Sequence, residues 1–183
     1  MSVVIVERVW ERAYTADELL TIYRDTGWCF GAHGVRPLVH ILAANGMRGC
    51  CLMEAPDAEA VRTARWSLGV RDPEHLWSAT LHGPCRTVAD LRRRAIDVGA
   101  TAMLVLVECS FAAPAEPDVV DAAVAAELSR RGAAVLTRLV SRDRRRMLCL
   151  VAAPDVDSVV DWATGGAGLP VDRAWAASVH FDD

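Results

Sequence analysis

Residues 48–57 read R-G-C-C-L-M-E-A-P-D, and residues 146–155 read R-M-L-C-L-V-A-A-P-D. The matching residues recur 98 positions further along the chain: Cys51 and Cys149, Pro56 and Pro154, Trp77 and Trp175. Nearer the start, V-I-V-E at 4–7 returns as V-L-V-E at 105–108. A self-repeat of this length indicates two copies of one structural unit rather than one irregular domain.

Hydrophobic periodicity and turn residues predict the same order of elements in both copies. In the first copy we expect a strand at 3–10, a helix at 16–31, strands at 35–43 and 48–54, a helix from Asp57 to about Ser67, and a strand at 75–82. Thr15 and Glu18 form a capping-box pair before the first helix, and Gly34 is a plausible stop after it. Asn45-Gly46 favours a tight hairpin because both residues tolerate positive φ.

The second copy repeats this order. Here we expect a strand at 102–109, a helix at 118–131, strands at 134–141 and 146–152, a helix at 156–164, and a strand at 173–181. Its hairpin tip is Arg142-Asp143-Arg144. The order β-α-β-β-α-β is that of the split-βαβ, ferredoxin-like unit.

One such unit leaves a largely apolar sheet face that needs cover, and the second copy can supply it. The predicted fold class is therefore α+β, with two ferredoxin-like repeats packed sheet to sheet as an intramolecular α+β barrel. The expected domains are repeat 1 at 1–83, a linker with a short helix at 84–100, and repeat 2 at 101–183. A cavity between the sheets is the natural place for a ligand.

Composition narrows the classes of function. All 20 basic residues are arginine, so a Schiff-base lysine is excluded, and the net charge of −4 argues against a nucleic-acid partner. No apolar run approaches the ~20 residues that cross a bilayer. The start M-S-V-V-I-V-E-R lacks the features of an export signal, and six scattered cysteines contain no C-x-x-C pair. We expect a cytoplasmic protein with reduced thiols that does not associate with membranes and is a monomer or homodimer.

Two glutamates hold equivalent places in the first strand of each copy, Glu7 and Glu108. A carboxylate in a central strand is costly to bury unless it finds a cation, a donor or a proton. Each glutamate is therefore either an acid–base group or ligand of a pocket, or the structural partner of a nearby arginine such as Arg8.

His40 and Arg138 are also equivalent, and both lie in strands with apolar flanks. An imidazole titrates near neutrality, so His40 is a candidate pocket residue, with Arg138 as an anion stabiliser. We expect His82 and His180 at the solvent edge and His33 as a helix cap. Cys51 and Cys149 are interpreted as small core residues, and Trp77 and Trp175 as packing residues.

The chain resembles a family of small bacterial ferredoxin-like proteins that are described as nickel-binding-protein-like. The resemblance lies in H-G-V-R at 33–36 and C-L-M-E-A-P-D-A-E-A-V-R at 51–62, and in C-L-V-A-A-P-D at 149–155 and G-L-P-V-D-R-A-W at 168–175. It implies a fused dimer of this unit and a divalent metal such as nickel, with His33 and His40 as ligands. The second copy has Arg131-Gly132 where the first has His33-Gly34, so an inherited metal site would be asymmetric or lost.

Two hypotheses remain open on the sequence. The first is a barrel that binds a metal ion or small organic ligand without turnover. The second is a cofactor-independent enzyme of isomerase, cyclase or monooxygenase type that acts on a hydrophobic secondary metabolite. In the enzyme, Glu7 or Glu108 would move the proton, Arg138 would stabilise an enolate or carboxylate, and His40 would assist.

Overall fold

The structure is a computed structural model of the whole chain. It describes residues 2–70, 73–99, 102–116, 133–166 and 169–181. The chain divides into two compact units, unit 1 (Met1–Ala79 with Ser178–Asp183) and unit 2 (Thr80–Ala177). The protein is α+β, and its strands pair antiparallel within each unit.

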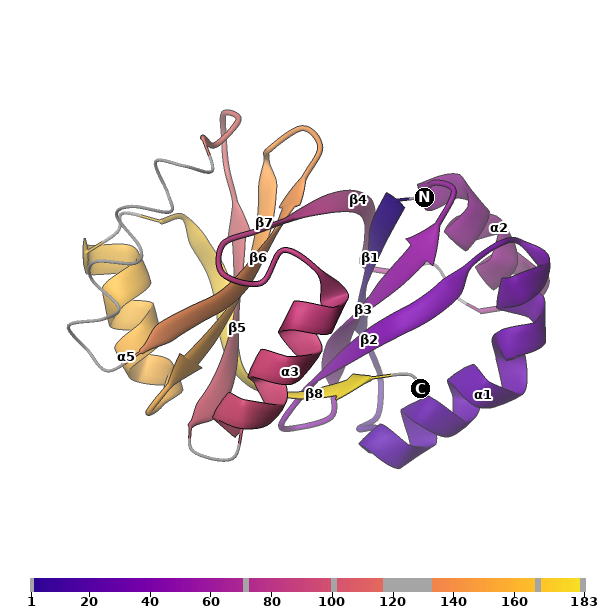
Figure 1. Cartoon of the computed structure of the whole chain (residues 1–183), viewed down its shortest axis with the longest axis horizontal. Helices are drawn as coiled ribbons and strands as arrows, with labels where there is room; N and C mark the ends of the chain where they lie inside the picture. Colours follow the sequence, from indigo (N-terminus) through magenta and orange to yellow (C-terminus); the bar gives the residue numbers. More distant parts are fainter. Residues whose placement is uncertain (1, 71–72, 100–101, 117–132, 167–168, 182–183) are drawn as a thin grey trace. The chain divides into compact units, whose positions relative to one another are not determined.

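Unit 1 follows the predicted order of elements. Its elements are β1 (Ser2–Val9), α1 (Ala16–Ala32), β2 (Arg36–Ala43), β3 (Arg48–Ala55), α2 (Ala58–Ser67), and the start of β4 (His75–His82). Strand β1 pairs with both β3 and β4, and β3 pairs with β2. The helices α1 and α2 lie next to these strands (Figure 1). The Cys29 thiol of α1 donates to the Ala64 carbonyl of α2.

Unit 2 has the same pairing scheme. It contains the end of β4, then α3 (Val88–Gly99), β5 (Met103–Ser110), β6 (Ala134–Ser141), β7 (Arg146–Ala153), α5 (Val156–Asp161), a π-helical turn η1 (Trp162–Gly166), and most of β8 (Val171–Phe181). Strand β5 pairs with β7 and β8, and β7 pairs with β6. Helix α3 falls in the predicted linker. The predicted helix at 118–131 lies outside the described residues.

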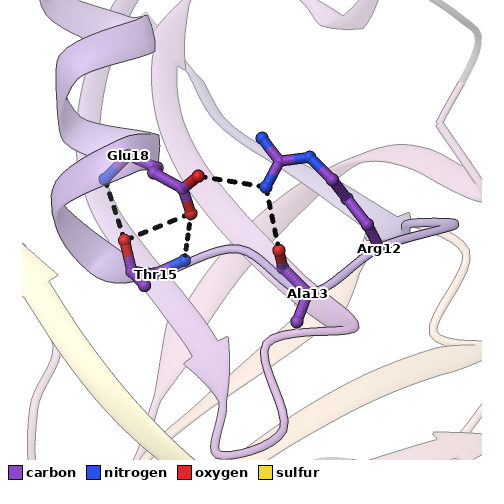
Figure 2. A network of polar contacts seen from close by, with 4 residues as sticks. All are labelled: Arg12, Ala13, Thr15 and Glu18. Atoms are coloured by element: carbon purple, nitrogen blue, oxygen red, sulfur yellow. Dashed lines mark hydrogen bonds and ion pairs between the residues drawn. The ribbon is translucent and has the colours of Figure 1, made fainter.

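The start of α1 confirms the predicted capping box. The Glu18 backbone N–H donates to the Thr15 hydroxyl at 3.2 Å, and the Thr15 N–H donates to the Glu18 carboxylate at 2.8 Å (Figure 2). These bonds satisfy amides that have no partner within the helix. The bond from Thr15 and the Arg12 guanidinium hold the pKa of the Glu18 carboxyl below its ordinary value. At the other end, Gly34 adopts φ of 66°, as its predicted role as a stop requires.

Both Pro-Asp copies begin a helix in the same way. The Asp57 carboxylate accepts a hydrogen bond from the Ala60 N–H at 2.9 Å, and the Asp155 carboxylate accepts one from the Ser158 N–H at 2.7 Å. An aspartate at this position satisfies an amide of the first turn and favours the positive helix terminus. The repeated sequence thus encodes a repeated cap.

The two hairpin tips also correspond. The N–H of Gly46 donates to Ala43 O, and the N–H of Arg144 donates to Ser141 O, both at 2.8 Å. Gly46 has φ of 68° and Arg144, 98 positions later, has φ of 58°. Asn45 tolerates positive φ but does not adopt it, since in the four-residue connection between β2 and β3 only Gly46 lies in that region.

One face of each sheet packs on helices. In unit 1 the buried cluster on this face consists of Val4, Val6, Tyr23, Phe30, Val35, Cys51, Met53, Ala55, Val61 and Ala64. In unit 2 the cluster joins the inward residues of β5 and β7 to Val159, Trp162 and Ala163. Alternate residues of the same strands point to the other face. This alternation decides which of the predicted site residues can meet.

Candidate functional site

Glu7 and Glu108 are buried, with exposed fractions of 4% and 6%. The indole N–H of Trp77 donates to Glu7 Oε1 at 2.5 Å, and that of Trp175 donates to Glu108 Oε1 at 2.7 Å. The Arg173 guanidinium also lies 3.5 Å from Glu108 Oε2. The repeated glutamates and the repeated tryptophans of the sequence therefore form the same indole–carboxylate hydrogen bond in both units. An indole donor offsets part of the cost of burying a carboxylate.

The structure does not bring Glu7 and His40 together. Residues that face each other in an antiparallel pair project to the same side of the sheet. Glu7 faces Cys50, whereas His40 faces Cys51. Because neighbouring residues of a strand point to opposite faces, Glu7 lies on the face away from the helices and His40 on the helix side.

Unit 2 separates its predicted pair in the same way. Glu108 faces Leu148 and Arg138 faces Cys149, so the two charged side chains project from opposite faces. Arg138 is 4% exposed, and a Cβ added at Gly83 would lie 3.1 Å from its Nη2. The buried guanidinium therefore lies directly under the glycine that follows β4.

His40 belongs to a buried cluster with Cys51 and Tyr23. Its Nδ1 lies 3.2 Å from Cys51 Sγ, and the Tyr23 hydroxyl oxygen lies 3.0 Å from the same sulfur. The rings of Tyr23 and His40 have centroids 4.2 Å apart. The Arg8 guanidinium lies over the Tyr23 ring, 5.6 Å from its centroid. A thiol, an imidazole and a phenol thus meet on the helix side of unit 1.

These neighbours change the acidity of both groups around the sulfur. Burial by itself raises the pKa of a thiol, but the charge and hydrogen bond of His40, with Arg8 and the Tyr23 hydroxyl, lower the pKa of Cys51 to about 7. Burial raises the pKa of Tyr23 above its ordinary range, against the opposing charges of Arg8 and Arg65. Tyr23 therefore stays a hydrogen-bond donor while Cys51 can ionise near neutrality.

The interpretation of Cys51 as a small core residue missed this arrangement. Cys51 is indeed buried, at 4% exposure, but its sulfur has polar partners on two sides. The signal was present in the hairpin: counting outward from the turn pairs Leu42 with Gly49, Ile41 with Cys50, and His40 with Cys51. The position of Tyr23 on α1 could not be read in this way.

A pocket of about 360 Å³ opens in unit 1, next to the same cluster. Its lining comes from the end of β1 and the loop after it, from α2, and from the loop before β4: Arg8, Val9, Trp10, Glu11, Arg12, Tyr14, Arg65, Val70, Pro73 and Glu74. Arg8 lines the pocket and also covers Tyr23. The guanidinium of Arg12 is held by Glu18 Oε1 and Ala13 O, both at 3.0 Å (Figure 2).

In the structure the predicted metal ligands His33 and His40 each have another polar partner. His33 is the C-terminal cap residue of α1, and its Nε2 lies 3.4 Å from Ser67 Oγ. The Nδ1 of His40 is directed at Cys51. Among the residues that the structure describes, no group of three or more histidine, cysteine or acidic side chains converges as a metal ion requires.

The histidines at the strand ends are half-buried rather than fully solvent-exposed. His82 Nε2 lies 2.8 Å from Thr80 Oγ1, and His180 Nε2 lies 2.9 Å from Ser178 Oγ. Burial and the nearby His40 lower the pKa of His180. Neither histidine lines the pocket.

Comparison with known proteins gives no assignment: no protein-family model matches the chain, and no curated protein matches its sequence. Within the described parts of the chain, none of the helices combines the length and the apolar character needed to span a membrane.

Proposed function

We propose that the protein binds a small organic molecule that carries an anionic group, in the pocket of unit 1. The observation that carries this proposal is that Arg8 and Arg65 line the same pocket as the aromatic residues Trp10 and Tyr14. The volume of about 360 Å³ is in the range of small-molecule sites. An apolar body would lie against the rings while the anionic group meets a guanidinium.

The charges of the pocket favour an anion. Its lining has three arginines and two glutamates, and Glu74 is also within 3.7 Å of Arg48, outside the lining. Arg12 is held by Glu18, and the other two arginines of the lining are Arg8 and Arg65. A guanidinium binds a carboxylate through two parallel hydrogen bonds, so the expected ligand class is a carboxylate with an aromatic or aliphatic body.

The test is a calorimetric titration with 2-naphthoate and its neutral isostere 2-naphthamide. We expect the carboxylate to bind more tightly than the amide, and Arg8→Gln to reduce its affinity by about tenfold or more. Arg142→Gln, in the hairpin of unit 2, is the matched control and should change nothing. Equal affinity for the two probes, or equal effects of the two variants, would contradict the proposal. A titration with Ni²⁺ in the same instrument tests the metal-binding form of the function.

We also propose the finer architecture: two ferredoxin-like repeats that pack sheet to sheet as an α+β barrel in a cytoplasmic protein related to the nickel-binding-protein-like family. The support is the internal sequence repeat and the shared pairing scheme, in which β1 and β5 hold matching places. A crystal structure with the two sheets apart would refute the barrel.

The second candidate is the cofactor-independent enzyme that acts on a hydrophobic secondary metabolite. The observation in its favour is the pair of buried carboxylates held by indole donors, Glu7 and Glu108. Within each unit the predicted partner, His40 or Arg138, projects from the sheet face opposite to the glutamate. Loss of turnover in Glu7→Gln and Glu108→Gln at unchanged melting temperature would support this function, and unchanged turnover would reject it.

A further inference from the structure

We propose that Cys51 is a reactive-thiol site, which a small hydroperoxide oxidises to a sulfenic acid, and that His40 and Tyr23 are the residues that position and activate its sulfur. The site is distinct from the ligand pocket, since none of these three side chains lines that pocket. The proposal therefore stands whether or not the pocket binds a carboxylate.

The geometry is that of a nucleophile with a base and a donor. Cys51 Sγ has His40 Nδ1 at 3.2 Å and the Tyr23 hydroxyl oxygen at 3.0 Å. The three residues come from β3, β2 and α1, so the arrangement depends on the packing of the helix on the sheet. Both distances suit hydrogen bonds to a thiolate, from the imidazolium N–H and from the phenol O–H.

Charged groups surround the cluster. Arg8 on β1 acts on the sulfur and on Tyr23, Arg65 on α2 acts on Tyr23, and His180 on β8 interacts with His40. Against the effect of burial, the charge and hydrogen bond of His40, together with Arg8 and the Tyr23 hydroxyl, lower the pKa of Cys51 to about 7, whereas burial raises the pKa of Cys109 to about 12. A substantial part of Cys51 is therefore thiolate at neutral pH, and the thiolate is the form that reacts.

The oxidation balances within the cluster. The Cys51 thiolate attacks one oxygen of the hydroperoxide, so that an S–O bond forms and the O–O bond breaks. Sulfur is oxidised by two electrons, and the departing oxygen is reduced. The imidazolium of His40 gives its proton to the leaving hydroxide or alkoxide, which departs as water or alcohol. The product is a sulfenic acid, the reversible first step of thiol oxidation.

Burial selects the reagent and limits the product. Cys51, His40 and Tyr23 are 4%, 2% and 4% exposed, so a reagent as small as hydrogen peroxide is favoured over a bulky disulfide. The neighbouring Cys50 projects from the opposite face of β3, so a disulfide between the two would require the strand to rearrange. We therefore expect the sulfenic acid to persist until the protein is reduced.

The chain contains its own control. Cys149 occupies the matching place in unit 2 and is also buried, at 1% exposure. The residue that faces it is Arg138, which cannot act as a proton acceptor or donate its proton to a leaving group. A comparison of Cys51 with Cys149 thus sets a cysteine that faces an imidazole against one that faces a guanidinium in one protein sample.

The experiment is a pulse of hydrogen peroxide on the intact protein, quenched with catalase. The protein is then denatured in dimedone and N-ethylmaleimide, and each cysteine is quantified by mass spectrometry. We expect Cys51 to become oxidised at least about tenfold faster than Cys149 at pH 7, with a rate that rises with pH through a midpoint near 7. His40→Gln should slow Cys51 by roughly tenfold or more and move the midpoint toward that of an ordinary thiol.

Three results would overturn the proposal. The first is equal oxidation of Cys51 and Cys149 in the wild-type protein, which would mean that reaction follows unfolding. The second is a midpoint near 9 for Cys51. The third is a folded His40→Gln variant that reacts as the wild type does. The first two comparisons need no variant, so they decide the matter even if His40→Gln does not fold. If Cys51 of a Tyr23→Phe variant is oxidised at the wild-type rate, Tyr23 has no part in activating the sulfur, and that role belongs to His40 alone.

Discussion

The strand pair β2–β3 of unit 1 and the pair β6–β7 of unit 2 place a cysteine in the same register but give it different partners. Cys51 faces His40, and Cys149 faces Arg138. Both cysteines lie in the cluster that packs on helices. The strand register and the burial of the sulfur are thus alike, while the group opposite the sulfur changes from one that can exchange a proton to a fixed cation.

Other features are the same in both units. The aspartate caps, Asp57 and Asp155, hold their helices alike, and the loop after the first strand binds the hairpin tip alike. In unit 1 the Tyr14 N–H donates to Gly46 O at 2.9 Å; in unit 2 the Ala115 N–H donates to Arg144 O at 2.8 Å. These backbone contacts are retained between the units, whereas the residue that faces the cysteine differs.

The largest expected effect is on the free energy of unfolding, when the positive-φ residues of the two hairpin tips, Gly46 and Arg144, are exchanged for other residues. A Cβ added at Gly46 would lie 2.5 Å from Tyr14 O, and the residue has positive φ. We expect Gly46→Ala to lower the free energy of unfolding by about 3 kcal/mol. Arg144→Gly should instead raise it by up to about 1 kcal/mol, because glycine suits φ of 58° and the lost ion pair with Glu116 is exposed. Urea unfolding measures both. The two substitutions should change the free energy of unfolding in opposite directions. A Gly46→Ala protein as stable as the wild type would contradict the expected difference between the two tips.

An intermediate effect on the free energy of unfolding is expected at the indole–carboxylate hydrogen bond that both units share. Trp77→Phe and Trp175→Phe each remove an indole donor from a buried carboxylate, so each should cost about 1–3 kcal/mol of unfolding free energy. Trp28→Phe is the control, because Trp28 is 75% exposed. Calorimetric melting of the three variants checks this. A cost confined to one unit would break the equivalence of Glu7 and Glu108.

The smallest expected effect is the loss of the ion pair between Arg36 and Glu54, whose matching positions in unit 2 are alanines. Arg36 faces Glu54 across β2–β3 with Nη2 2.7 Å from Oε2, whereas Ala134 faces Ala152 at the matching place. The arginine side chain is 70% exposed, so a double-mutant cycle of Arg36→Ala and Glu54→Ala should give a coupling below about 1 kcal/mol. High salt should reduce it further. A larger coupling would mark this pair as a structural difference between the units.

Much of the fold could be predicted from local sequence. The strand at 75–82 and the strand at 134–141 have the predicted bounds, and α1 begins directly after its predicted cap. These features are encoded locally, by side-chain periodicity and by a threonine or aspartate that binds nearby amides. The turn at Asn45-Gly46 was also placed correctly, between β2 and β3. The sequence did not show which of the two residues adopts positive φ, and in the structure it is Gly46.

The site was harder to predict. Burial of Glu7 and Glu108 follows from their central strands, but the indole partners come from strands about 70 residues further along the chain. Glu7 and His40 do not meet because they face neighbouring residues of β3, Cys50 and Cys51. One step along a strand moves a side chain to the other face of the sheet. The pocket is lined mainly by the end of β1 with the loop after it and by the loop before β4, and no local pattern encodes how these segments approach each other.

By itself the sequence determined the duplication, the caps, the strands and the buried glutamates, because each depends on residues a few positions apart or on an internal comparison of the chain. Only the tertiary structure decided that Tyr23 of α1 and His40 of β2 converge on the sulfur of Cys51. The acidity of a buried thiol depends on charges and donors within a few ångströms in space. Those distances are set when the helix packs on the sheet.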